Sequence, residues 1–305
     1  MYKPEGVYPA MVTPFNEEGS VDETVLRQLV DWLIDEGVSG LFPLGSVGEF
    51  IHLDFAEKAR IIEIVSSQAA DRVPVTPGTT DSCASNCIKL TQKAYESGCA
   101  AVVISPPYYI PVSQEQIEEH YEQVFAVFPD YPVILYNIPL FSTPIDYDVV
   151  KRLSRYSNVV GMKDSSGSMV DFMHFMDKIR LVGSDLNMMT GREEMLCAAL
   201  AVGAKGTMTA TAGIVPEIMI GIYKAWQDGD RDKAMKLQLD VLQLIRAMFA
   251  LPFPLGFKAA LEVRGFKMGG SKRPLSDADQ YNYQKVESRI EKILNQLGVG
   301  QVLTG

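Results

Sequence analysis

The sequence predicts a (β/α)8 barrel with a C-terminal helical extension. Short β-branched runs alternate with longer amphipathic segments eight times, as expected for parallel strands joined by helices. After about Pro216 the strand-like runs stop and only helical patterns remain. An open doubly wound sheet is the alternative, but the glycine pattern that binds phosphate is absent after the first strand. The closed barrel is therefore the expected fold.

Each expected strand is a short apolar run, and apolar residues at helical spacing follow it. The strands are expected at residues 6–13, 40–45, 73–76, 101–105, 132–136, 159–163, 186–189 and 206–209. The first helix has Asp22 as its N-cap and Gly37 as its C-terminal stop. Later helices are expected to begin near Asp54, Asp81, Ser113, Asp146 and Glu193.

The C-terminal part carries three further helical patterns, at residues 234–250, 256–264 and 277–297. No Gly/Ser-rich linker separates them from the preceding segments. We therefore expect a barrel over residues 1–225 and a helical appendage over residues 226–305 that packs on it.

Composition limits the class of protein and its partners. A hydrophobic content of 47% with 22% charged residues is typical of a soluble globular chain. No apolar run approaches the roughly 20 residues that span a bilayer, so no membrane partner is expected. The net charge of −10 argues against nucleic acid, because phosphates are bound by Lys and Arg. The N-terminus lacks a signal-peptide pattern, which favours the cytoplasm.

Cysteine and histidine do not indicate a metal site. The pair Cys83 and Cys87 has the spacing of helix packing rather than of a zinc motif, and a disulfide is not expected in a reducing cytosol. The histidines are scattered, which suggests neither a metal site nor a Ser-His-Asp triad; they are His52, His120 and His174. The expected chemistry thus uses neither a metal nor a separate cofactor.

Lys163 is the first candidate for chemistry. It follows Val159, Val160 and Gly161 in a run that otherwise predicts a buried strand. Lysine is almost never buried without a partner, so its place in a core strand requires a reason. In an apolar, closed site an amine can lose its proton and attack a ketone to form a Schiff base. The competing interpretation places Lys163 at the strand's end with its amine in water.

Other reactive groups fall where neighbouring strands are expected to end, which is where such barrels carry their active sites. The second strand ends in Gly-Ser-Val-Gly-Glu at residues 45–49, where adjacent amides can face a carboxylate. The fourth ends near Tyr108 and Tyr109, framed by prolines, and the fifth ends at Tyr136. Each feature alone also fits a tight turn, a surface or subunit contact, or a core tyrosine. Their coincidence at strand ends favours an active site.

Held together, these motifs resemble the family of pyruvate-dependent, Schiff-base class I aldolases that contains dihydrodipicolinate synthase and N-acetylneuraminate lyase. The resemblance spans nearly the whole chain. The matching segments are residues 9–15, 45–49, 107–109, 136–139, 161–167 and 252–261.

The resemblance implies a role for each catalytic candidate. Lys163 would attack the keto carbon of pyruvate or of a related 2-oxo acid, so that the only cofactor-like group is the lysine imine itself. Tyr136 would move protons, and Ser46 would hydrogen-bond Tyr136. Tyr109 would complete this relay from a neighbouring subunit, which implies a homo-oligomer built as a dimer of dimers.

The resemblance also implies a substrate pocket, and here the chain departs from the family twice. The pocket residues are expected to be Gly45, Val47, Phe141, Gly191, Glu193 and Met208. Val47 replaces the usual threonine, so the backbone amides at this turn would bind the pyruvate carboxylate. Phe141 replaces the arginine with which dihydrodipicolinate synthases hold the carboxylate of aspartate semialdehyde, and losing that cation is not conservative. Arg192 is a nearby cation, but we expect Glu193 and Glu194 to compete for its charge.

Gly191 and Glu193 match a turn with which the sialic acid and sugar-acid branches bind hydroxyl groups. Glu193 fits equally well as an acid at a helix N-terminus. The leading expectation is a lyase that reversibly cleaves a hydroxylated 2-oxo acid, sialic-acid-like or a 2-keto-3-deoxy sugar acid, to pyruvate and a neutral aldehyde. The alternatives are 4-hydroxy-tetrahydrodipicolinate synthase and a sugar-acid-binding barrel without turnover.

Overall fold

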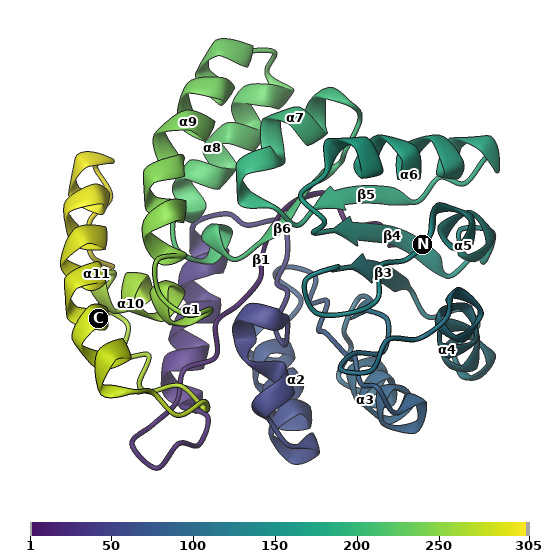
Figure 1. Cartoon of the computed structure of the whole chain (residues 1–305), viewed down its shortest axis with the longest axis horizontal. Coiled ribbons are helices and arrows are strands. Elements are labelled where there is room, and N and C mark those ends of the chain that lie inside the picture. The colour runs from purple at the N-terminus through teal and green to yellow at the C-terminus, as the bar shows by residue number, and fades with distance from the viewer. Residues whose placement is uncertain (1, 303–305) are drawn as a thin grey trace.

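The computed structural model describes residues 2–302 and contains one six-stranded, wholly parallel sheet (Figure 1). Its strands are β1 Gly6–Pro9, β2 Val102–Ile104, β3 Val133–Asn137, β4 Val159–Asp164, β5 Asn187–Thr190 and β6 Gly206–Thr209. They are ordered β1-β6-β5-β4-β3-β2, so sequential strands are neighbours from β2 to β6. All six coincide with predicted strands, and the predicted parallel α/β class is confirmed.

The second and third predicted strands, at residues 40–45 and 73–76, were wrong as continuous strands. These segments form only isolated parallel bridges, which join Ala10 to Phe42, Leu41 to Val75 and Gly78 to Val103. Proline has no N–H to donate to a ladder, and these two segments contain Pro43 and Pro74. Leu44 also has a left-handed backbone, with φ of 60°. The bridges nevertheless connect β1 to β2 across the remaining side of the sheet.

The helices pack around the outside of the strands (Figure 1). They are α1 Glu23–Asp35, α2 Phe55–Ala69, α3 Ala84–Glu96, α4 Gln114–Val127, α5 Tyr147–Leu153, α6 Met169–Leu181, α7 Leu196–Ala201, α8 Pro216–Gln227, α9 Arg231–Met248, α10 Leu255–Val263 and α11 Asp277–Gln296. Short 3-10 turns are η1 Ser46–Gly48, η2 Phe50–His52, η3 Glu193–Met195 and η4 Thr211–Gly213.

Three of the predicted helix starts have a side-chain cap. The Asp22 side chain accepts from the amide of Val25, and Asp54 and Ser113 each form a capping box. Gly37, with φ of 89°, lies just beyond the end of α1, as predicted. The helix expected at Glu193 differs in form, because η3 precedes a short α7.

The last three helices form the expected helical C-terminal part. In Figure 1, α10 and α11 lie beside α1 at one side of the molecule, and α11 packs against both α10 and α9. Among residues 2–302, no helix combines the length and the apolar character that a bilayer crossing requires.

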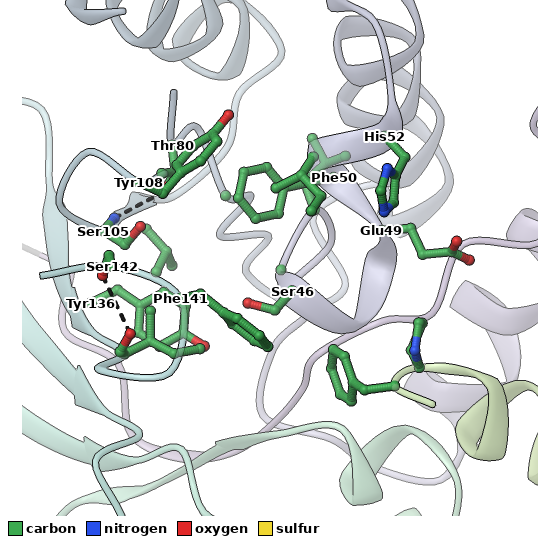
Figure 2. Close-up of a pocket in the computed structure, with 18 of the residues that line it drawn as sticks. Ser46, Glu49, Phe50, His52, Thr80, Ser105, Tyr108, Tyr136, Phe141 and Ser142 are labelled. Carbon is green, nitrogen blue, oxygen red and sulfur yellow. Dashed lines mark hydrogen bonds between the residues drawn. The ribbon is translucent and has the colours of Figure 1, made fainter. Parts of the chain in front are cut away.

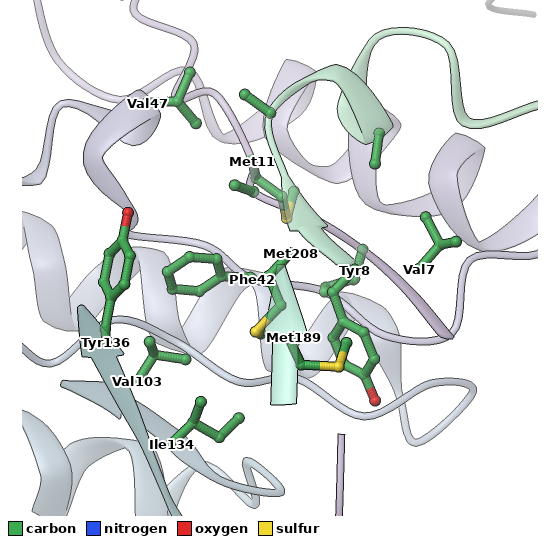
Figure 3. Packing of buried hydrophobic residues seen from close by; sticks show 14 of the residues in the cluster. Val7, Tyr8, Met11, Phe42, Val47, Val103, Ile134, Tyr136, Met189 and Met208 are labelled. Atoms are coloured by element: carbon green, nitrogen blue, oxygen red, sulfur yellow. The ribbon is translucent and has the colours of Figure 1, made fainter. Parts of the chain in front are cut away.

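Apolar side chains fill the space enclosed by the strands. Figure 3 shows Tyr8, Phe42, Met189 and Met208 converging there, and all four are buried. Tyr136 lies at the edge of the same cluster. The interior is therefore a packed core rather than a pore, and reactive groups are accessible only where the strands end.

One close backbone contact at the start of the sheet requires glycine. Gly206 of β6 pairs with Gly6 of β1, and a Cβ at Gly206 would lie 1.9 Å from the carbonyl oxygen of Gly6. Gly206 has φ of 156°, where an L-residue is strained. The two strands can approach because Gly206 has no side chain at this point.

Gly206→Ala should therefore lower the free energy of unfolding by about 2–4 kcal/mol, from overpacking and backbone strain together. Urea denaturation measures the change. Gly300→Ala is the matched control, because nothing lies within 4 Å of a Cβ there. Equal stability of the two variants would show that the β1–β6 contact can relax.

Candidate active site

The candidate site begins with two neighbouring strands that end together. Tyr136 of β3 and Lys163 of β4 are register partners, as are the next residues, Asn137 and Asp164. Alternate residues of a strand face opposite sides. The pairing therefore places both reactive side chains on one side of the sheet, at its carboxyl end.

Lys163 is buried to 4% exposure among aromatic rings. Its Nζ lies 4.1 Å from the ring centroid of Tyr136 and 4.6 Å from that of Phe42. Within the part of the chain that the structure describes, no carboxylate forms an ion pair with it. The prediction that Lys163 lies within a buried strand is confirmed, and the alternative with its amine in water is wrong.

Gly191 provides the space that Lys163 occupies. A Cβ at Gly191 would lie 2.6 Å from Lys163 Cε and 2.0 Å from Ser165 Oγ. Gly191 and Lys163 line the same cavity. This glycine thus has a steric role beside the amine that its sequence motif did not reveal.

A buried hydrogen-bond network fixes the ends of β3 and β4. Asn137 Nδ2 donates to Asp164 Oδ1 at 2.7 Å, and Ser166 Oγ donates to Asp164 Oδ2 at 2.7 Å. The amide of Ile145 donates to Asn137 Oδ1. Burial raises the pKa of the Asp164 carboxyl above its usual value, while the bonds from Asn137 and Ser166 oppose that rise. The residues beside Tyr136 and Lys163 are therefore held in one arrangement.

The turn at residues 45–49 faces this pair. Ser46 and Val47 open the 3-10 turn η1, and Thr13 Oγ1 donates to the carbonyl of Gly48 at 2.8 Å. Among residues 2–302, the amides of Ser46 and Val47 donate to no backbone carbonyl, as is usual for the first amides of a helical turn. This agrees with the expectation that these amides would bind a carboxylate.

Glu49 anchors that turn to the C-terminal part. Its carboxylate lies 2.9 Å from Lys258 Nζ of α10, and both side chains are fully buried. Ser271 Oγ and the amide of Lys272 also donate to Glu49, at 2.6 and 3.1 Å. Burial lowers the pKa of Lys258, and the charge of Glu49 opposes that effect. No local sequence pattern predicts this partner for Glu49, because Lys258 is 209 residues away in the chain.

Two adjoining hollows open at this end of the sheet. A cavity of about 270 Å³ contains Lys163 and is lined also by Ser46, Val47, Tyr136, Glu193 and Met208. A second, of about 320 Å³, is shown in Figure 2 and is lined by Gly45, Tyr108 and Tyr109 among others. Ser46, Tyr136 and Phe141 line both hollows.

The expected proton relay is not closed within one chain. Ser46 and Tyr136 line the same cavities, but no hydrogen bond joins their hydroxyls in the described residues. Tyr109 is 94% exposed, lies only at the second hollow, and has a left-handed backbone with φ of 78°. Such strain in a non-glycine residue often marks a functional position.

Glu193 also lines the Lys163 cavity. It is buried, and its Oε1 accepts from the amide of Ala210 at 3.2 Å. Burial raises the pKa of its carboxyl, and the charges of Lys163 and Arg192 partly oppose this. Among residues 2–302, neither Glu193 nor Glu194 forms an ion pair with Arg192, although the charge of Arg192 acts on the Glu193 carboxyl, so the competition for that charge stays a prediction.

Sequence reasoning missed the aromatic wall of the cavity. Phe249 and Phe253 line it beside Phe141, and the Phe141 and Phe253 ring centroids are 6.1 Å apart. Phe249 lies at the end of α9 and was assigned only to a helical pattern. The run at residues 252–257 was noticed for its motif, but nothing in it indicated which rings would face the site. No group of three or more His, Cys, Asp or Glu among residues 2–302 could hold a metal.

A parallel α/β sheet with buried reactive groups at its carboxyl end has the architecture of an enzyme. Residues 3–293 match the Dihydrodipicolinate synthetase family. The chain therefore belongs to that family of enzymes, as its motifs predicted.

Several known proteins resemble the chain over nearly its full length. A 4-hydroxy-tetrahydrodipicolinate synthase of Trichlorobacter lovleyi is 35% identical over 94% of this chain and 98% of its own. One of Thermodesulfovibrio yellowstonii is 34% identical over 92% and 96%. The structure of a dihydrodipicolinic acid synthase family protein from E. coli K12, in complex with pyruvate, is 30% identical, covers 97% and 99%, and has a TM-score of 0.87. A monomeric dihydrodipicolinate synthase variant, 23% identical over 97% of both chains, shares the fold with a TM-score of 0.89.

The burial of Glu193 predicts a pH-dependent contribution to stability. With its pKa raised, the folded chain holds this proton where the unfolded chain has lost it, so the free energy of unfolding falls as pH rises above 4.5. Glu193→Gln removes this contribution. The variant should gain stability relative to the wild type as pH rises from 4.5 to neutral.

Urea denaturation at a series of pH values measures the difference. Glu194→Gln is the control, because this neighbouring side chain is exposed. A stability difference between wild type and Glu193→Gln that stays constant with pH would contradict the prediction.

Proposed function

We propose that the protein is a pyruvate-dependent class I aldolase in which Lys163 forms an imine with the keto carbon of pyruvate. The observation that carries this proposal is the Lys163 amine, buried in a cavity against the Tyr136 ring and without a carboxylate partner in the described residues. The contacts with the Tyr136 and Phe42 rings do not by themselves explain a lysine within a core strand. An amine nucleophile explains its presence.

The reaction follows from the groups at hand. The amine attacks the keto carbon, and water leaves as the imine forms. The protonated imine accepts electrons when a proton leaves the pyruvate methyl group, and the resulting enamine attacks an aldehyde carbon. Tyr136 supplies the proton transfers from the neighbouring strand. The first amides of η1 bind the pyruvate carboxylate, and water then releases the product from Lys163.

The proposal extends to the fold that presents these groups. We infer a closed (β/α)8 barrel, in which the segments at residues 40–45 and 73–76 complete the circle as short, proline-interrupted strands. The parallel bridges from Ala10 to Phe42, Leu41 to Val75 and Gly78 to Val103 support this.

We consider two classes of compound as the second substrate. The relatives named 4-hydroxy-tetrahydrodipicolinate synthase favour condensation with an aldehyde that carries a carboxylate, so this alternative now leads. Cleavage of a hydroxylated 2-oxo acid to a neutral aldehyde remains the second candidate, because Glu193 lies in the cavity and can accept hydrogen bonds from hydroxyls.

Pyruvate with borohydride should add one reduced pyruvyl group per chain at Lys163, because hydride reduces the imine to a stable amine. Lys163→Ala should abolish the labelling. Peptide mass spectrometry locates the label, and Lys205→Ala is a control that removes another lysine. A folded wild type that takes up no label, or takes it up elsewhere, would favour the binding barrel without turnover.

We also propose that Tyr109 acts in the site of a neighbouring subunit, within a dimer that pairs into a tetramer. Its exposure and left-handed backbone in a single chain support this, because an exposed ring held in a strained conformation fits a contact with another chain. The apolar residues Ile110 and Leu140 are also largely exposed, at 68% and 65%.

Tyr109→Phe should lower turnover about 10- to 100-fold without loss of stability, because the hydroxyl moves a proton and the side chain is almost fully exposed. When Tyr109→Phe is mixed with inactive Lys163→Ala, hybrid dimers contain one complete site, and activity should rise. Native mass spectrometry confirms subunit exchange. Exchange without any gain in activity would show that the site is not shared.

A further inference from the structure

Among the described residues that line the Lys163 cavity, Arg192 is the one cation to which the proposed chemistry gives no role. The cavity has three charged lining residues: Lys163, Arg192 and Glu193. Lys163 becomes the imine, and Glu193 is engaged with the amide of Ala210. Arg192 is thus a charged lining residue without a role, whereas Lys163 and Glu193 each have one.

No acid of the described chain neutralises this guanidinium. None of the ion pairs within residues 2–302 includes Arg192. Glu194 points to solvent, and burial favours the protonated form of Glu193, by raising its pKa. A half-buried arginine beside a cavity and without a carboxylate is suited to bind one from a ligand.

The other lining residues of this cavity offer no second cation for an anion. Leu140, Phe141, Phe249 and Phe253 have no side-chain donors, and the hydroxyls of Ser46, Tyr136 and Ser165 are uncharged. The unpaired amides of η1 are assigned to the pyruvate carboxylate. A second carboxylate in this cavity would be buried at a cost of several kcal/mol unless a cation met it. Arg192 is the remaining donor with the fork geometry that suits a carboxylate.

We propose that Arg192 binds the carboxylate of the second substrate, which is therefore an aldehyde that carries an acid group. This rests on the proposed function, since it assumes that pyruvate occupies Lys163. It places the anion-binding residue on the loop after β5, whereas the arginine implied by the family resemblance would lie at Phe141, after β3.

A structural role is the competing explanation for Arg192. A Cβ at Gly167 would lie 3.2 Å from its Nε, so the guanidinium packs over the loop after β4, where Gly167 has φ of 79°. An arginine that only packs there would give no preference between charged and neutral aldehydes. A preference that disappears with the guanidinium therefore separates the two roles.

The probes are 4-oxobutanoate and its methyl ester, which differ in one negative charge. Wild-type protein is first converted to the borohydride-reduced pyruvyl form, and calorimetry measures its affinity for each aldehyde, so no turnover is required. Steady-state kinetics with pyruvate on untreated enzyme give the corresponding KM and kcat. The variants are Arg192→Gln, Arg192→Lys and the control Arg289→Gln, which removes an exposed arginine of α11.

We expect wild type and Arg289→Gln to bind the acid about 10- to 100-fold more tightly than the ester. Arg192→Gln should lose that preference, because its affinity for the acid falls while its affinity for the ester stays the same. Arg192→Lys should retain part of the preference. Equal loss for acid and ester, or no loss, overturns the assignment while leaving the lysine chemistry intact. Failure of borohydride labelling in the wild type instead overturns the proposed function and the assignment that rests on it. Labelling in Arg192→Gln shows that its site is still formed.

Discussion

The register between β3 and β4 is the constraint on which the site depends. It aligns Tyr136 with Lys163 and, one residue further, Asn137 with Asp164. The first pair lines the cavity, while the second is held in place by a buried hydrogen bond of 2.7 Å. A slip of one residue would move every side chain to the opposite face. The Asn137–Asp164 hydrogen bond therefore stabilises the register that aligns Tyr136 with Lys163, because a slip would leave a buried carboxyl without its donors.

The sequence predicted the positions of the six strands from short apolar or β-branched runs, although β1 ends at Pro9, before the expected end at residue 13. It failed at residues 40–45 and 73–76 for a local reason. Hydrophobicity predicts burial, and these segments are largely buried, but burial does not require a hydrogen-bonded ladder. Proline removes donors without changing the apolar pattern, so the pattern alone overestimates strand length.

The site was predictable where a residue type was improbable for its position, as with a lysine in a core strand. It was less predictable where the contact partner was distant or the side-chain direction mattered. Glu49 and Lys258 form an ion pair although most of the chain separates them in sequence, and the residues around each do not predict this contact. Arg192 was discounted because two acids follow it in sequence, yet adjacent residues on a turn point in different directions. Sequence proximity is a poor guide to charge pairing outside regular helices.

The Glu49–Lys258 contact also has a consequence for biosynthesis. The turn that carries Ser46 and Val47 is made early by the ribosome, but its buried carboxylate has no counter-charge until α10 has emerged. Ser271 and Lys272, which complete its hydrogen bonds, follow later still. A buried carboxylate without these partners is strongly unfavourable, so we expect the turn to stay open in the nascent chain. The turn proposed to bind the pyruvate carboxylate would then reach its final conformation only after these C-terminal residues have been synthesised. The nascent chain would therefore not carry a formed substrate site.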